Sequence, residues 1–197
     1  MTLAQGRLPR FTQPDDPHAR DAEIEELAQS RVARARIDIV LEHPYFAAAL
    51  LAIPLRGSSE AAIPQAVVTD GARIVYRYDL VAALDRVEIR RLILHALAHV
   101  LLKHPERGGA REWRLWTASC DLAVEGLFDS LGIGTSMRAE DLRPFRGKSA
   151  EQIYAQIAAD ASAARAAHEA AAINRNDGML PPPHEPEDRD DEDAAKD

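Results

Sequence analysis

Two histidines that stand four residues apart give the sequence its clearest chemical signal. His95 and His99 project from one face of a helix if the segment around them is helical, because residues i and i+4 are neighbours on a helix surface. Two imidazoles at this spacing can share one metal ion, as in zinc-binding helices. The alternative is a pair of core histidines that are satisfied by hydrogen bonds. Residues 92–102 are apolar nearly all round, so two unsatisfied imidazoles there would cost several kcal/mol, and a metal ion would satisfy both.

A metal ion needs at least one further ligand, and two residues are candidates. His104 comes nine residues after His95, on the opposite face of a continuous helix, so it can take part only if the helix stops before it. Asp121 lies 22 residues after His99, in a segment with its own helical pattern, and a hairpin return would bring it over the histidine pair. We therefore prefer Asp121 and keep His104 as the alternative. Glu125 follows one turn later and could orient a histidine; otherwise both acids belong to a solvated helix face.

The residue after the first histidine is the wrong type for a complete catalytic motif. In His-Glu-x-x-His enzymes the glutamate is the general base for the metal-activated water, whereas this chain has Ala96 at that position. Loss of that proton transfer removes a rate factor of about 100 to 10,000. Ala96 is either natural or an introduced Glu→Ala change. A glutamate placed there is expected to reach a water-filled cleft and to leave the fold stability nearly unchanged.

The elements that must position these residues are predicted to be mostly helical. Apolar residues at helical spacing predict helices over residues 21–42, 45–54, 80–84, 85–103, 113–131 and 149–173. Only residues 65–69 and 73–78 have convincing β character, and Asp70-Gly71 between them predicts a tight hairpin turn. Residues 56–62 are expected to form an irregular break. The predicted fold class is therefore α+β, mostly helical, with a small β-hairpin or sheet.

Length and charge distribution predict one domain with two irregular ends. The chain has 197 residues, of which 46% are hydrophobic, which suits a single domain with a sizeable core. We place an irregular segment at residues 1–20, the domain at 21–175 and a disordered acidic tail or linker at 176–197. Residues 181–197 begin with three prolines and hold eight acidic and two basic residues, which accounts for −6 of the total charge of −8.

Composition also excludes several classes of function. The remaining −2 leaves the domain nearly neutral, which argues against a nucleic-acid binder with a basic face. No apolar run approaches the roughly 20 residues that a membrane span requires. A single cysteine, Cys120, rules out an internal disulfide and suits a reducing compartment. The sequence therefore predicts a cytoplasmic protein that binds neither nucleic acid nor membrane.

Several segments, taken in order, give the chain a more specific resemblance. They are residues 43–46 (His-Pro-Tyr-Phe), 69–71 (Thr-Asp-Gly) with 74–76 (Ile-Val-Tyr), 94–99 (Leu-His-Ala-Leu-Ala-His) with His104 and Arg107, 115–121 (Leu-Trp-Thr-Ala-Ser-Cys-Asp), and 149–154 (Ser-Ala-Glu-Gln-Ile-Tyr). Over roughly residues 30–157 the chain resembles a bacterial family of zincin-like metallopeptidase domains. Members of this family often precede a von Willebrand factor A-like domain and occur near MoxR-type AAA ATPases.

The resemblance implies a zincin-type fold, a Zn²⁺ cofactor and a protein or peptide substrate. It also implies a possible von Willebrand A-like domain and MoxR-type ATPase as partners, and the helix with Asp121 as the source of another ligand beside the histidine pair. The strand with Ile74, Val75 and Tyr76 would border the cleft, where extended peptides could add to its edge by main-chain hydrogen bonds.

The chain departs from the family pattern at two positions that bear on function. The family has Glu where this chain has Ala96, and it commonly has Asn where this chain has Glu125. The leading hypothesis is a zinc-dependent peptidase domain that Ala96 leaves inactive. The alternatives are a non-catalytic metal-binding module that holds a peptide or partner, and a structural helical domain without metal.

Overall fold

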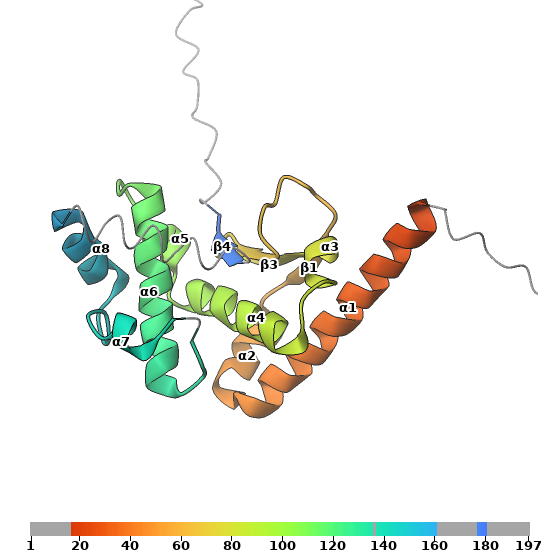
Figure 1. Cartoon of the computed structure of the whole chain (residues 1–197), viewed down its shortest axis with the longest axis horizontal. Helices are drawn as coiled ribbons and strands as arrows, with labels where there is room; N and C mark the ends of the chain where they lie inside the picture. The colour runs from red at the N-terminus through yellow and green to blue at the C-terminus, as the bar shows by residue number, and fades with distance from the viewer. Residues whose placement is uncertain (1–16, 136, 161–176, 181–197) are drawn as a thin grey trace, which may run out of the picture.

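The computed structural model describes residues 17–135, 137–160 and 177–180 (Figure 1). Its elements in chain order are α1 (Pro17–Glu42), α2 (Pro44–Ala52), β1 (Leu55–Ser58), β2 (Val67–Thr69), β3 (Ile74–Arg77), α3 (Tyr78–Val81), α4 (Arg86–Leu101), α5 (His104–Arg107), α6 (Trp113–Leu131), α7 (Ala139–Leu142), α8 (Ala150–Ala159) and β4 (Asp177–Met179). The described part of the chain is thus a mostly helical α+β fold with one small sheet, as predicted.

The ends of the helices follow from proline and capping residues. Helix α1 ends at Glu42 because Pro44 disfavours helical geometry in the residue before it, and Pro44 then opens α2. Helix α1 begins at Pro17, four residues earlier than predicted, so residues 17–20 are not irregular; residues 1–16 lie outside the described residues. Helix α8 begins at a capping box on Ser149 but ends at Ala159, where the prediction continued to residue 173; residues 161–173 lie outside the described part.

The sheet has four strands in the order β1-β3-β2-β4. Strands β2 and β3 form the predicted antiparallel hairpin, whose turn is closed by Asp70 Oδ1 accepting from the backbone N–H of Ala72 and Arg73. Strand β1 pairs parallel with β3, and β4 pairs parallel with β2. The sequence predicted neither outer strand, because each is too short to show an alternating pattern and forms only through pairing with distant residues.

Two sequence-based predictions are corrected by this strand order. Strand β3, with Ile74, Val75 and Tyr76, was predicted to offer an edge to peptides, but β1 and β2 pair with it on both sides, so its backbone has no open edge. Residues 177–179 were predicted to belong to a disordered tail, but they form β4, and Met179 is 6% exposed. Residues 181–197 lie outside the described residues.

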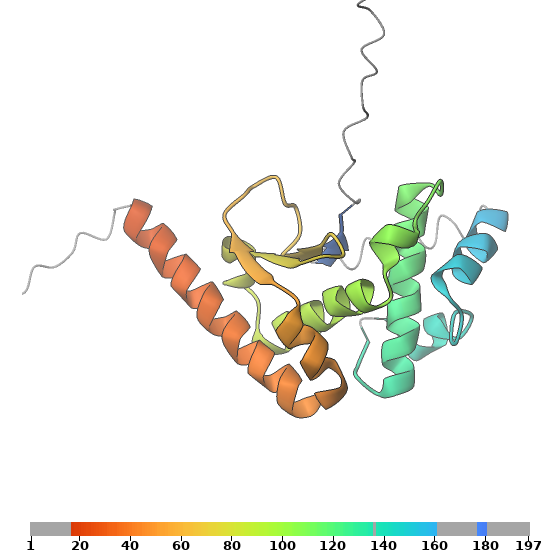
Figure 2. The ribbon, with the colours of Figure 1, turned by 180° about the vertical axis from the view of Figure 1, so that it is seen from behind.

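Helix α4 lies at the centre of the described structure (Figures 1 and 2). Its N-terminus is fixed by a capping box in which Asp85 Oδ1 accepts from the Glu88 N–H and Glu88 Oε2 accepts from the Asp85 N–H. Nine of its 16 residues are buried, which confirms the prediction of a central, apolar helix. Helix α1 packs along one side of α4, and β2 and β3 contact it as well.

A second helical group, formed by α6, α7 and α8, packs beside the C-terminal end of α4 (Figure 2). Trp116 on α6 is fully buried, and its Nε1–H donates to the backbone oxygen of His104 at 3.0 Å. Leu115 and Leu122 on the same helix pack against Ile153 and Ile157 of α8. These contacts fix the face of α6 that turns toward α4.

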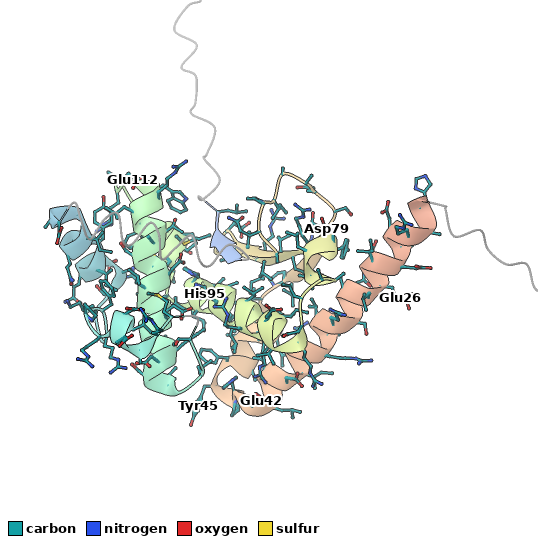
Figure 3. All side chains as sticks on the ribbon, viewed as in Figure 1. Glu26, Glu42, Tyr45, Asp79, His95 and Glu112 are labelled. Carbon is teal, nitrogen blue, oxygen red and sulfur yellow. The ribbon has the colours of Figure 1, made fainter. Side chains whose placement is uncertain are left out.

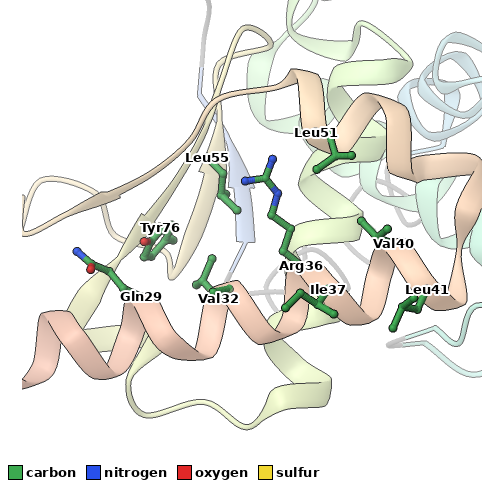
Figure 4. A pocket seen from close by; sticks show the side chains of 10 residues that line it. Gln29, Val32, Arg36, Ile37, Val40, Leu41, Leu51, Leu55 and Tyr76 are labelled. Carbon is green, nitrogen blue, oxygen red and sulfur yellow. The ribbon is translucent and has the colours of Figure 1, made fainter.

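An apolar groove runs along α1, where this helix faces α2 and the sheet (Figure 4). It has a volume of about 590 Å³ and lies between α1, Leu51 of α2, Leu55 of β1 and Tyr76 of β3. Leu41 on its rim is 74% exposed. None of the histidines or acids singled out by the sequence lines this groove. Its residues are therefore suitable positions for control substitutions. Among the described residues, no helix combines the length and apolar character needed to cross a membrane.

One ion pair between α5 and α8 yields a stability prediction. Arg107 Nη2 donates to both carboxylate oxygens of Glu151 at 2.6 Å. Burial opposes ionisation of Glu151, but the hydrogen bonds from Arg107 outweigh it and lower its pKa to about 2. Because the pair is about one-third exposed, we expect Glu151→Gln to lower the free energy of unfolding by only about 1 kcal/mol at pH 7.

The pH dependence of this difference follows from the direction of the shift. A carboxylate whose pKa is lowered by folding stabilises the fold above its unfolded pKa, and this stabilisation is lost as pH falls from about 4.5 toward 2. Urea unfolding curves of wild type and Glu151→Gln should therefore converge over that range. Glu140→Gln, at an exposed ion pair, is the control with little effect. If the free energies of unfolding of wild type and Glu151→Gln differed by the same amount at every pH, the ion pair with Arg107 would not be the cause of the difference.

Candidate metal centre

Helix α4 carries both histidines among its buried residues, and Figure 3 shows His95 at the end of α4 next to α6. His95 is 1% exposed and His99 is 2% exposed, and their ring centroids lie 4.7 Å apart. The i, i+4 spacing on a regular helix therefore places both imidazoles side by side, as the sequence predicted. Two buried imidazoles need polar partners, and the surrounding helices supply them.

Asp121 on α6 faces the Nε2 atoms of both histidines. Its Oδ1 lies 3.2 Å from His99 Nε2 and 3.5 Å from His95 Nε2. One ligand atom from each of the three residues lies within 4.8 Å of the others, which makes them a group that could hold a metal ion. Two imidazole nitrogens and one carboxylate oxygen form a donor set typical of catalytic zinc sites, where three protein ligands leave a further position open. The three residues therefore fit a divalent metal ion.

The opposite nitrogen of each histidine has its own neighbour. His95 Nδ1 lies 3.6 Å from Glu125 Oε1, and His99 Nδ1 lies 3.1 Å from His104 Nδ1. Metal-binding histidines commonly use the nitrogen that faces away from the metal to contact a carboxylate, carbonyl or other acceptor, which fixes the ring orientation and the tautomer. Both Nε2 atoms thus face Asp121, while each Nδ1 atom faces a different polar side chain.

The position of His104 depends on how α4 ends. Helix α4 stops at Leu101, and Lys103 adopts a left-handed conformation with φ of 55°, so α5 begins in a new direction at His104. A continuous helix would have placed His104 on the far face, and the break instead returns it to His99. It meets the Nδ1 side of that ring, whereas the Nε2 side faces Asp121.

Burial and hydrogen bonding together determine the protonation states of His104 and Asp121, the two groups that flank His99. Burial, followed by the nearby charge of His99, lowers the pKa of His104 to about 3, so its ring is neutral at neutral pH. Burial alone would raise the pKa of Asp121, but hydrogen bonds to His95 and His99 outweigh it and hold that pKa below its usual value. Asp121 is therefore an ionised carboxylate, the form that binds metal ions.

The comparison with protein families bears directly on this arrangement. Residues 28–190 match the model of a family described as "putative metallopeptidase domain". The chain belongs to this family. No curated protein and no solved structure matches the chain. The metallopeptidase family match covers all the residues of the candidate centre and extends past β4.

In this metallopeptidase domain, the surroundings of position 96 differ from those that the sequence predicts. A glutamate at position 96 is expected from the sequence to reach a water-filled cleft, but Ala96 is 2% exposed and belongs to the main hydrophobic cluster. The helical pattern fixed which residues share a face with His95, but it could not show how closely other elements cover that face. A glutamate at this position would therefore have to extend its carboxylate from a buried site on α4.

One residue near the centre escaped the sequence-based prediction. Arg91 Nη1 lies 3.3 Å from Glu125 Oε1, on the side of that carboxylate next to His95. Glu125 itself is 1% exposed, so its charge requires such partners. Arg91 stands four residues before His95, and this spacing could have identified it as a neighbour on the same helix face.

Proposed function

We propose that this chain is a zinc-dependent metallopeptidase domain in which Ala96 stands where the general base is needed. The observation that carries the proposal is the convergence of His95 Nε2, His99 Nε2 and Asp121 Oδ1 in a chain of the metallopeptidase family. Zn²⁺ is the ion we expect, because two neutral imidazoles and a carboxylate suit zinc better than the oxygen-preferring Ca²⁺ or Mg²⁺.

The residues of the chain have separate roles in this proposal. A bound zinc ion supplies a Lewis acid that polarises a peptide carbonyl and lowers the pKa of the attacking water. His95 and His99 hold the ion through Nε2, and Asp121 binds it as a carboxylate. Glu125 and His104 keep the two rings in the orientation that directs Nε2 inward.

Ala96 supports a second candidate, a metal-binding module that holds a peptide or partner without cleaving it. Alanine can neither accept nor donate a proton, so the chain supplies no base at the position where the family has one. Asp121 and Glu125 are carboxylates that lie beside the histidine pair, and both already serve imidazoles. We therefore expect the chain with Ala96 to bind zinc and to show little or no peptide hydrolysis.

Partners and cellular location follow only from the resemblance and the composition. We propose a cytoplasmic protein that acts on protein or peptide substrates. A von Willebrand A-like domain and a MoxR-type ATPase are the proposed partners, and purified versions of both belong in any activity assay that gives a negative result.

The ligand assignment is tested by comparing Asp121→Ala with His104→Ala. Zinc affinity, measured by competition with a chromophoric chelator, should fall more than a hundredfold for Asp121→Ala, because a ligand is lost. His104→Ala should lower it by about 10–100-fold, the usual effect of removing a residue that orients a ligand. Asp129→Ala, further along α6, is the matched control. The reverse ranking would make His104 the ligand and contradict the proposed centre.

A further inference from the structure

Strand β4 lies on the outer edge of β2 and is joined to it by main-chain hydrogen bonds. Asp177, Gly178 and Met179 pair in parallel with Val67, Val68 and Thr69. The N–H of Leu180 donates to the Thr69 backbone oxygen at 2.8 Å and extends the pairing by one residue. Without β4, β2 would present a row of unpaired N–H and C=O groups, which is the template that an extended peptide requires.

The side chain of Met179 fills a pocket between the sheet and α6. Met179 is 6% exposed and belongs to one buried cluster with Trp116, Cys120 and Ala150, whose side chains define this pocket. Methionine is a flexible, apolar side chain that adapts to irregular pockets. The pocket and the edge of β2 therefore hold this segment in the way a peptide-binding domain holds a ligand, with hydrogen bonds for the backbone and a pocket for one side chain.

This edge lies beside the candidate metal centre. Cys120 and Trp116 belong to the same buried cluster as Met179. Cys120 directly precedes Asp121 on α6, and Trp116 Nε1–H donates to the backbone oxygen of His104. Strand β4 also contacts α4, the helix that carries the histidine pair. Figures 1 and 2 both show β4 at the side of the sheet nearest α6, above α4.

We propose that the outer edge of β2, together with the Met179 pocket, is a binding site for extended peptides, which residues 177–180 of the chain occupy from within. The peptide class is an extended segment with an unbranched apolar side chain at the Met179 position. A small residue suits the Gly178 position, where an added Cβ would lie 2.9 Å from the Gln65 side chain. The site would deliver peptides to the metal centre, and in that respect the inference rests on the proposed function.

Strand β4 is held weakly enough for a separate peptide to replace it on the edge of β2. Strand β4 has three residues, whereas a stable strand usually has five or six. Among the described residues, β4 pairs with one strand, β2, because it is the last strand of the sheet. A competing peptide that makes the same bonds therefore needs to displace only one short strand and one side chain.

The test uses the full chain and a fluorescent peptide with the sequence of residues 175–182, Arg-Asn-Asp-Gly-Met-Leu-Pro-Pro. Met179→Glu places a charge in an apolar pocket and should release β4, so this variant should bind the peptide at least tenfold more tightly than wild type, as measured by fluorescence anisotropy. Met179→Leu, which keeps the pocket filled, and Leu41→Glu, which adds the same charge in the distant groove, should both behave like wild type. A peptide with Glu in place of its Met should not bind to any of them.

Hydrogen exchange on wild type gives a measurement that depends on no variant. A large excess of the unlabelled peptide should accelerate exchange of the Leu180 N–H, because displacement of β4 breaks its bond to Thr69. Equal peptide binding by wild type and a folded Met179→Glu variant, or a Leu180 N–H that the peptide does not affect, would overturn the proposal. Peptide binding is measured in the presence of a chelator, so it does not depend on zinc. A failure of the peptide to bind would therefore contradict this proposal alone, and a failure of the chain to bind zinc would contradict only the proposed function.

Discussion

Replacing Ala96 with glutamate is expected to raise chelator-sensitive peptide hydrolysis by a factor of about 100 to 10,000, the usual contribution of a general base. The carboxylate would stand one residue after His95, on the helix that carries the histidine pair, where it can take a proton from the attacking water. The measurement is cleavage of an unstructured protein substrate by both forms of the chain, with and without chelator.

The matched control for this change is Ala96→Gln, which has nearly the same size but cannot act as a base. Ala96 is 2% exposed, so we expect either polar side chain to lower the free energy of unfolding by about 1–3 kcal/mol. Because both variants share this cost, a gain in activity that only the glutamate shows isolates the proton transfer. Equal chelator-sensitive cleavage by the wild-type, Glu and Gln forms would contradict the assigned role of position 96. A folded, zinc-loaded Glu variant that remains inactive would favour the binding module.

The double substitution of His95 and His99 by alanine is expected to reduce bound zinc from about one ion per chain to near zero. The two Nε2 atoms supply two of the three ligand atoms, and Asp121 alone cannot replace them. Metal content should be measured by mass spectrometry on protein purified without a chelator or a histidine tag. His43→Ala, at the junction of α1 and α2, is the matched control and should retain the ion.

Zinc binding should also appear as a gain in stability. Free zinc at about 1,000 times the dissociation constant should stabilise wild type by about 4 kcal/mol, because the ion binds the folded state preferentially. The double variant should show no such gain in a thermal unfolding experiment with added zinc. A wild-type chain that stays free of metal after zinc addition, with no shift in melting temperature, would leave only the structural role for the histidine pair.

The parts of the centre that the sequence could predict are those that depend on helical spacing. His95 and His99 share a face because of the i, i+4 rule, and Asp121 and Glu125 share the facing side of α6 for the same reason. The structure brings these four residues together. Apolar periodicity is a local property of the chain, so it can be recognised without knowledge of the contacts between elements.

The parts that could not be predicted depend on single residues or on distant pairing. His104 lies beside His99 only because Lys103 adopts a left-handed conformation. Lysine rarely adopts this conformation, and no local sequence pattern predicts it. Strands β1 and β4 have three or four residues each and acquire their structure from β3 and β2. For this reason the strand with Ile74, Val75 and Tyr76, which was predicted to offer an open edge, lies in the interior of the sheet.

The sharp reversal at Lys103 also determines when the centre can assemble during synthesis. Every side chain of the candidate centre and its outer partners lies within residues 91–125, on the three consecutive helices α4, α5 and α6. Contacts that are this close in sequence require little loop-closure entropy and form early in folding. Strand β4, which lies beside the centre, comes more than 50 residues later. As the chain leaves the ribosome from its N-terminus, these three helices can therefore fold and take up an ion before the strand that will lie beside them has been made.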